Sequence, residues 1–298
     1  MNVRSIEAAA RAYEARGRAE LNARLAFFRE LWRVQGAIEH DAPAWAAPSV
    51  REVSALVAAG APVLGEFPAA VDAAVLGEAC ARVAACFAAH GSFGADETAW
   101  LAGADWADIA ALVPAEVAGA NPSAYVAALQ DALVRDGVSA ERARMAALVA
   151  ASALKPLVEP AATAVSGLFK SGLASETGPD GHPCSCPVCG CAPAAAYVGR
   201  TPHSHGNGRL LWCGACGAQW EFERVRCPHC GTRNQEHLHY VGIVGDEAHR
   251  LYVCDECGGY LRTRFVEQGE LAPFSFEVED AVMADLDALA ARGSSGLI

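Results

Sequence analysis

Cys186-Pro-Val-Cys189-Gly190 is the first of four C-x-x-C-G loops in this chain of 298 residues. The other three are Cys213-Gly-Ala-Cys216-Gly217, Cys227-Pro-His-Cys230-Gly231 and Cys254-Asp-Glu-Cys257-Gly258. A shift of 41 residues places every cysteine of the first two loops on a cysteine of the last two, and 23 residues separate the loops within each pair. The loops therefore form a duplicated unit, and each copy supplies four thiols.

Two cysteines three positions apart in a tight turn can direct both sulfurs to one point. Two such turns facing each other form a tetrahedral S4 site with metal–sulfur bonds of about 2.3 Å. Glycine after the second cysteine permits a left-handed backbone, and the turn can point N–H groups at the thiolates. The alternative is chance or disulfide-forming pairs, but disulfide frameworks are typical of small secreted domains. The spacing therefore predicts two metal ions.

Pairing the first loop with the second and the third with the fourth gives two equivalent modules, whereas an interleaved pairing would leave the repeat unexplained. The predicted ligands of the first ion are Cys186, Cys189, Cys213 and Cys216, and those of the second are Cys227, Cys230, Cys254 and Cys257. Four thiolates accept either iron or zinc, so the ligand set by itself leaves the metal open.

Length and composition indicate a globular protein of about two domains, since 53% of the residues are hydrophobic. The first residues, Met1-Asn-Val-Arg-Ser-Ile-Glu7, lack the apolar segment of a signal peptide, and no later stretch reads as about 18 uninterrupted apolar residues. We therefore expect a cytoplasmic protein without membrane insertion, and metal-held reduced thiols suit that compartment.

The charge pattern argues against a nucleic-acid partner. The net charge is −12 in all, with −7 over residues 1–181, +1 over 182–264 and −6 over 265–298. Nucleic-acid-binding proteins ordinarily carry a basic face that neutralises phosphates. A nearly neutral cysteine-rich segment between acidic ones does not have this pattern.

Residues 1–175 are rich in alanine and leucine, and the pattern predicts a bundle of about six or seven helices. Four apolar residues at helical spacing share one face; they are Leu21, Leu25, Phe28 and Trp32. Ser49 with Glu52 has the form of a capping box, Asn121-Pro122 that of a helix start, and Gly91 and Gly137 sit where helices should end. Cys80 and Cys86 are expected to be buried thiols of a helix.

The spacing of apolar residues changes from helical to alternating after a turn-rich linker at residues 175–183. Alternating segments such as Leu261-Arg-Thr-Arg-Phe265 predict strands, and Asn207-Gly208 predicts a tight hairpin turn. We expect an α+β fold, mainly α. Its parts are a helical bundle over 1–175, two tandem rubredoxin-like or zinc-ribbon-like β modules over 184–266, and an acidic C-terminal region over 267–298 with one helix from Val278 to Ala291.

The order of these motifs resembles the FdhE-type formate dehydrogenase accessory proteins. In that family a CPVCG loop precedes a loop that ends in a tryptophan strand, as in Cys213-Gly-Ala-Cys216-Gly-Ala-Gln-Trp220. The third and fourth loops resemble the family in Val225-Arg-Cys227 and in Cys254-Asp-Glu-Cys257-Gly-Gly-Tyr260-Leu261. The resemblance covers residues 184–266. Before them, one stretch alone is reminiscent of the family, Phe27-Phe28-Arg-Glu-Leu31-Trp32-Arg-Val-Gln35.

The resemblance implies a cytoplasmic, rubredoxin-like protein that binds two iron ions at its eight loop cysteines. It also implies an interaction with the catalytic subunit of respiratory formate dehydrogenase, which the protein helps to mature. Zinc is a possible substitute for the iron. No catalytic residue comes with the resemblance, and the sequence contains no phosphate loop, nucleophile elbow or paired-carboxylate motif, so we expect a protein that is not an enzyme.

Two alternatives stay open at this point. A rubredoxin-like electron carrier or reductase would act on the same client, and a zinc-ribbon nucleic-acid-binding regulator is disfavoured by the acidic charge.

Cys184 and Cys191 flank the first loop outside the family pattern. They are expected to be spare exposed loop thiols, with a role in thiol exchange or redox chemistry as the less favoured interpretation.

Overall fold

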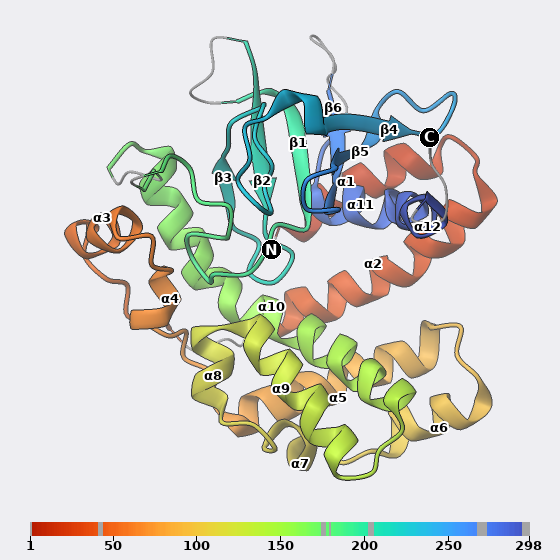
Figure 1. Cartoon of the computed structure of the whole chain (residues 1–298). Coiled ribbons are helices and arrows are strands. Elements are labelled where there is room, and N and C mark those ends of the chain that lie inside the picture. The colour runs from red at the N-terminus through yellow and green to blue at the C-terminus, as the bar shows by residue number, and fades with distance from the viewer. Residues whose placement is uncertain are drawn as a thin grey trace.

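The computed structural model describes residues 2–40, 44–173, 177–178, 180–201, 206–266 and 273–293. Figure 1 shows a helical part, a β-sheet above it, and C-terminal helices that return between the two. The predicted fold class, a helical region followed by a cysteine-rich β region, is confirmed. The two β modules are not separate ribbons, however, because their strands join into one sheet.

The helical part has ten helices among the described residues up to Lys170, more than the six or seven expected, because several are short. The longer ones are α1 (Val3–Glu14), α2 (Ala19–His40), α5 (Ala73–His90), α9 (Pro122–Arg135) and α10 (Ala140–Lys170). The shorter ones are α3 (Val50–Ala58), α4 (Val63–Glu66), α6 (Ala95–Gly103), α7 (Trp106–Ala110) and α8 (Ala115–Ala120).

The predicted helix signals are confirmed. Ser49 and Glu52 form a reciprocal capping box at the start of α3, and the side chain of Asn121 caps α9 ahead of Pro122. Helix α5 ends at His90 directly before Gly91, and Gly137, at φ +84°, lies just after the end of α9. These local signals set where helices begin and end, because they satisfy backbone groups that a helix leaves unpaired.

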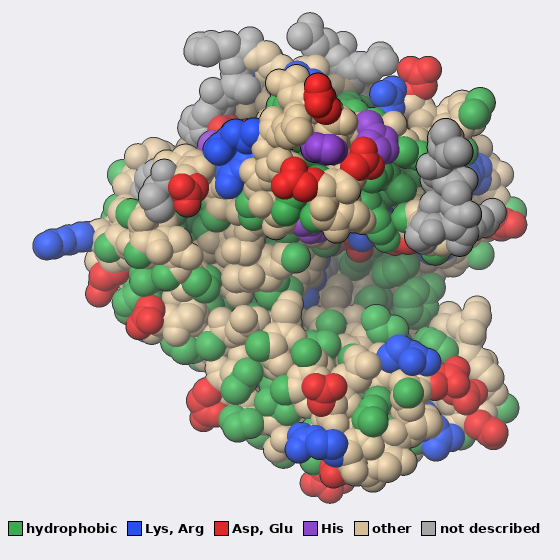
Figure 2. All heavy atoms as spheres, in the orientation of Figure 1, with side chains coloured by type: hydrophobic (Ala, Val, Ile, Leu, Met, Phe, Trp, Pro, Cys, Tyr) green, Lys and Arg blue, Asp and Glu red, His purple; other side chains and the backbone are tan. Residues whose placement is uncertain are grey.

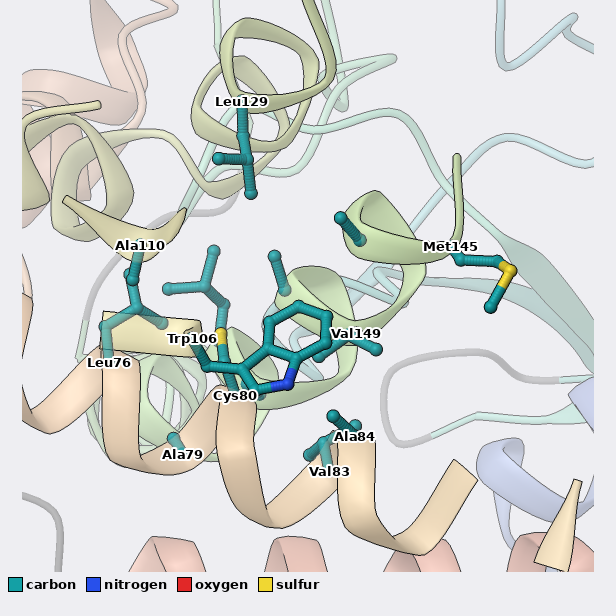
Figure 3. Packing of buried hydrophobic residues seen from close by; sticks show 14 of the residues in the cluster. Leu76, Ala79, Cys80, Val83, Ala84, Trp106, Ala110, Leu129, Met145 and Val149 are labelled. Carbon is teal, nitrogen blue, oxygen red and sulfur yellow. The ribbon is translucent and has the colours of Figure 1, made fainter. Parts of the chain in front are cut away.

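The main helical core lies between α2, α5, α7, α9 and α10. Figure 3 shows Trp106 of α7 beside Cys80 of α5 and Val149 of α10. The indole N–H of Trp106 donates to the Leu101 carbonyl at 3.1 Å, so the ring is buried with its polar atom paired. Cys80 and Cys86 are buried as expected, and burial raises the pKa of Cys80 to about 12.

Helix α10 runs for 31 residues although it contains Pro156 and Pro160. A proline has no N–H, so Pro156 cannot donate to the carbonyl of Ser152 four residues earlier. The buried side chain of Gln35 on α2 supplies the missing donor, with its Nε2 2.8 Å from the Ser152 oxygen. A side chain from a neighbouring helix thus satisfies the carbonyl that the proline leaves free.

Replacing Gln35 with alanine should lower the free energy of unfolding by about 1–3 kcal/mol, because the Ser152 carbonyl would stay buried without a donor. Urea unfolding followed by circular dichroism measures the change. The matched control is Arg33→Ala on the same helix, which removes only exposed ion pairs with Glu7 and Glu30 and should cost less than about 1 kcal/mol. Equal losses in the two variants would contradict this account of Gln35.

In the part of the chain that the structure describes, the sheet has six strands in the order β3-β2-β1-β6-β5-β4. Their bounds are β1 (Ala195–Arg200), β2 (Asn207–Trp212), β3 (Gln219–Glu221), β4 (Leu238–Gly242), β5 (His249–Cys254) and β6 (Tyr260–Phe265), and the 3₁₀ helix η1 (Gln235–His237) precedes β4. Neighbouring strands are antiparallel except β1 and β6, which pair in parallel from Ala195↔Arg262 to Val198↔Phe265. This parallel pair joins the two copies of the repeat.

The hairpin expected in the first copy is present, but its turn is not at Asn207-Gly208. Asn207 pairs with Arg200 and Gly208 with Gly199, so both residues belong to the start of β2. The connection lies before them, and residues 202–205 are outside the described part. The Asn-Gly signal failed here because the strand pairing of the sheet extends further than the local turn preference indicates.

The described residues of the C-terminal region form two helices, α11 (Phe276–Val282) and α12 (Ala284–Gly293), where the sequence predicted one. Helix α11 packs its apolar face on α1 and α2, and Val278 and Ala281 share a buried cluster with the predicted α2 face of Leu21, Leu25 and Trp32. Figure 1 shows these helices between the sheet and α2. The end of the chain, residues 294–298, is outside the described part.

Among the described residues two helices, α5 and α10, are long and apolar enough to cross a membrane by length and composition. In this fold 44% of the apolar 18-residue segment of α5 is buried, and 78% of the corresponding segment of α10. Both helices belong to the main helical core, where an apolar surface is covered by other helices.

Candidate metal centre

The four C-x-x-C-G loops have the same backbone structure. In each loop the glycine N–H donates to the carbonyl of the first cysteine, as Gly190 does to Cys186 at 2.8 Å. The glycines following the second cysteines all have positive φ, between 69° and 78°. An L-residue with a Cβ rarely adopts this conformation, which explains why all four loops end in glycine.

The loops bring the eight sulfurs together in two groups of four. Within each group all sulfurs lie within 4.8 Å of one another. The groups are Cys186, Cys189, Cys213 and Cys216, which we call the buried site, and Cys227, Cys230, Cys254 and Cys257, which we call the open site. Each site combines the first loop of its repeat copy with the second.

The sulfur spacing suits a tetrahedral ion. Bonds of about 2.3 Å place the sulfurs of a tetrahedral S4 site about 3.8 Å apart. The distance between the sulfurs of Cys186 and Cys216 is 3.6 Å, and that between Cys189 and Cys213 is 3.5 Å. In the open site, the two corresponding distances are both 3.8 Å. The sulfur spacing therefore fits iron or zinc at both sites.

Backbone N–H groups point at the sulfurs of the open site. Those of His229 and Cys230 lie 3.3 and 3.5 Å from the Cys227 sulfur. Burial by itself would raise the pKa of Cys254, but the backbone N–H groups of Cys257 and Glu256, together with the neighbouring thiols of Cys227 and Cys257, outweigh it and hold the pKa below that of an ordinary thiol. Donors aimed at a thiolate stabilise its charge, which favours the form that binds a metal.

The two sites differ in how far they are covered. All four cysteines of the buried site are at most 1% exposed. In the open site Cys227 and Cys254 are equally buried, whereas Cys230 and Cys257 are exposed. The same local motif thus has two different surroundings.

Helices of the N-terminal part cover the buried site. At the start of α4 the N–H groups of Val63 and Leu64 donate to the carbonyls of Pro187 and Val188, at 3.0 and 2.8 Å. These carbonyls belong to the first loop, between its two cysteines. The first turn of a helix has N–H groups without an intrahelical partner, so α4 uses them to hold the loop. No sequence signal pointed to Val63 or Leu64, because the contact joins segments more than 120 residues apart.

Cys191 is not the exposed loop thiol that we expected. It is 6% exposed, and the hydroxyl of Ser123 on α9 donates to its sulfur at 2.8 Å. Cys184 is half-buried and lies against the third loop, with its sulfur 3.8 Å from the Cys227 carbonyl. The expectation of exposure failed because helices and the second copy of the repeat cover this segment. A role of either thiol in exchange or redox chemistry stays a hypothesis.

No family model matches the chain. A protein FdhE homolog of Stutzerimonas stutzeri is 33% identical over 108 residues, which make up 36% of this chain and 33% of that protein. An FdhE homolog of Pseudomonas aeruginosa is 31% identical over 111 residues, or 35% of this chain and 33% of that protein. These matches span about a third of the curated relatives.

A solved structure extends the similarity beyond that segment. The crystal structure of the FdhE protein from Pseudomonas aeruginosa aligns with a TM-score of 0.52 and 21% identity, covering 92% of this chain and 85% of the other. At that identity the alignment establishes a shared fold.

The fold and the site together define a class of protein, in which a helical region carries one mixed sheet and two four-cysteine groups. Within that class, the resemblance to the FdhE-type proteins is confirmed, in sequence over about a third of the chain and in fold over most of it.

Proposed function

We propose that this protein is a non-catalytic accessory protein that helps a respiratory formate dehydrogenase to mature in the cytoplasm. The observation that carries the proposal is the coincidence of two similarities, in sequence with several FdhE homologs and in fold with an FdhE structure. Two four-cysteine groups of tetrahedral spacing support it, since the family resemblance rests on those cysteines.

The eight loop cysteines would hold one ion in the buried site and one in the open site, and we propose iron at both. The buried ion would fix the first two loops against α4, and the open ion would join the last two loops. Zinc fits the same sulfur spacing and, by the usual order of affinities, competes with ferrous iron at thiolate sites. We also propose the domain division at residues 1–175, 184–266 and 267–298.

We propose the catalytic subunit of formate dehydrogenase as the partner, bound by a surface to which the cysteine-rich domain contributes. The face seen in Figure 2 has Lys and Arg side chains scattered among Asp and Glu, rather than gathered as on a phosphate-binding surface. With a net charge of −12, this arrangement favours a protein partner over a nucleic acid.

Affinity capture from anaerobically lysed cells, with mass spectrometry of the bound proteins, tests the partner. We expect the tagged protein to recover a formate dehydrogenase catalytic subunit, and the Cys186→Ser/Cys257→Ser variant to recover at least tenfold less. Cys184→Ser is the matched control, because it removes a neighbouring thiol from outside both sites. Intact metal content and full formate dehydrogenase maturation in the double variant would refute the proposal, as would capture of nucleic acid in place of the subunit.

The exposure of Cys230 and Cys257 favours one second candidate, an electron carrier that acts on the same client. An iron–thiolate site that transfers electrons needs an edge near the surface, and its potential depends on N–H···S bonds such as those to Cys227. A reversible visible absorbance change on reduction of the iron-loaded protein would support this role, and a smaller change in Cys257→Ser would assign the missing part to the open site.

A further inference from the structure

The surroundings of the four loops differ where the loop glycines meet the rest of the protein. A methyl group placed on Gly190 would lie 3.3 Å from Cγ of Pro62, and one on Gly217 would lie 3.3 Å from Cδ of Glu159 on α10. The same addition at Gly258 would meet no heavy atom within 4 Å, apart from its immediate neighbours in the chain. The loops of the buried site are therefore packed against the helical part, and the fourth loop is not.

The open site has an inner and an outer half. Cys227 and Cys254 are at most 1% exposed, and Cys230 and Cys257 face the solvent. Each short sulfur pair, Cys227 with Cys257 and Cys230 with Cys254, joins an inner thiol to an outer one. A ligand arriving from solution can thus reach two of the four metal–sulfur bonds while the inner two keep the ion in place.

The inner half is firmly held. Arg226, 7% exposed, donates through Nε to the Gly231 carbonyl in the third loop and through Nη1 to the carbonyl of His182, at 3.3 and 2.8 Å. The N–H groups of His229 and Cys230 fix the Cys227 sulfur. Loss of the outer ligands would therefore leave a preformed pair of inner thiols that can accept an ion again.

The buried site offers no such access. Its four sulfurs lie in an apolar cluster that includes Val63, Leu64 and Trp220, and α4 is hydrogen-bonded to the first loop across the cluster. An incoming ligand reaches those sulfurs only when elements packed around them, such as α4, separate from the loops. Opening of that kind requires breaking packed apolar contacts, so it is much rarer than the motion of an exposed side chain.

We propose that the open site releases its metal ion to chelating ligands from solution while the protein stays folded, and that the buried site retains its ion. This inference rests on the proposed function only in taking both four-cysteine groups as metal sites. A donor atom of the incoming ligand would first form a bond to the ion as the bond to the Cys230 or Cys257 thiolate breaks. Further donor atoms of the ligand would then displace Cys227 and Cys254, and the released thiolates would take protons from water. No electron is transferred.

Competition with a coloured chelator tests the inference. The protein is loaded with two equivalents of Zn²⁺, its metal content is measured, and an excess of 4-(2-pyridylazo)resorcinol is added while absorbance is followed. We expect one equivalent to leave at least tenfold faster than the other. Iodoacetamide added after the fast phase should modify Cys230 and Cys257, located by mass spectrometry, and leave Cys213 and Cys216 unmodified.

Two variants assign the phases. Cys257→Ser should abolish the metal equivalent that leaves fast and keep the equivalent that leaves slowly. Leu64→Ala opens a cavity beside the first loop and should speed the slow phase several-fold without changing the fast phase, whereas Leu112→Ala, at an exposed position, should change neither.

The inference is overturned if two bound ions leave at one rate, or if the slow equivalent is the one held by Cys257. Binding of fewer than two ions would instead count against both four-cysteine groups as metal sites, and so against the metal part of the proposed function.

Discussion

Cys213→Ser should leave most of the protein insoluble or unfolded, whereas Cys257→Ser should lose one metal ion and keep its fold. Cys213 is fully buried, and its site lies in the cluster that joins the helices to the sheet. Structural zinc sites contribute roughly 10–16 kcal/mol of apparent binding free energy to folding. Because domains are stable by only about 5–15 kcal/mol, the damaged buried site should remove most of that margin.

The open site should respond less because the exposed Cys257 lies away from that cluster. Soluble yield, metal content and melting temperature compare the two variants, and we expect Cys213→Ser to melt at least 10 °C below Cys257→Ser if it is soluble. Cys86→Ser is the control for a buried thiol outside both sites, and it should bind two ions. Equal melting temperatures for the Cys213 and Cys257 variants would show that the helices do not depend on the buried site.

Lys155→Met should lower the free energy of unfolding by about 3–5 kcal/mol, because it leaves the Glu277 carboxylate buried without its cation. The Lys155 ammonium lies 2.9 Å from Oε1 of Glu277 and 4.8 Å from the ring centre of Trp212. Both charged side chains are largely buried, at 8% and 14% exposure. This ion pair joins α10 to α11 beside strand β2, so its loss should loosen the C-terminal helices from both.

A double variant separates the interaction energy between Lys155 and Glu277 from the contribution of each side chain alone. Lys155→Met/Glu277→Leu should regain most of the lost stability, since replacing both partners removes the unpaired charge. Urea unfolding of the wild type, both single variants and the double variant completes the cycle. A double variant as unstable as the sum of the single variants would contradict the account.

The same pair gives a pH dependence. Burial would raise the pKa of Glu277, but the Lys155 charge and the Ser275 hydroxyl outweigh it and lower the pKa from 4.5 to about 2. A carboxyl group with a lowered pKa stabilises the fold above its unfolded pKa and loses that contribution as the pH falls through the folded value. We therefore expect the wild type to lose this contribution, roughly 3 kcal/mol, between about pH 4.5 and 2. The Lys155→Met variant should lose less in that window.

The sequence alone was sufficient for features that depend on near neighbours in the chain. The C-x-x-C-G loops predicted the left-handed glycines, and Ser49 with Glu52 and Asn121 with Pro122 predicted helix starts, because caps and tight turns are made within a few residues. The repeat indicated which loops lie together, and the structure places the four sulfurs of each copy in one group. The α2 stripe beginning at Leu21 likewise predicted a buried face.

Only the tertiary structure decided what surrounds those features. The loops of the two sites share the C-x-x-C-G pattern, yet α4 covers one site and leaves the other open, through hydrogen bonds from Val63 and Leu64 to a segment far along the chain. The burial of Cys191, the donor that Gln35 provides beside Pro156, and the parallel pairing of β1 with β6 also join distant segments. Local spacing carries no information about such partners, because they meet only when the helices and the sheet pack together.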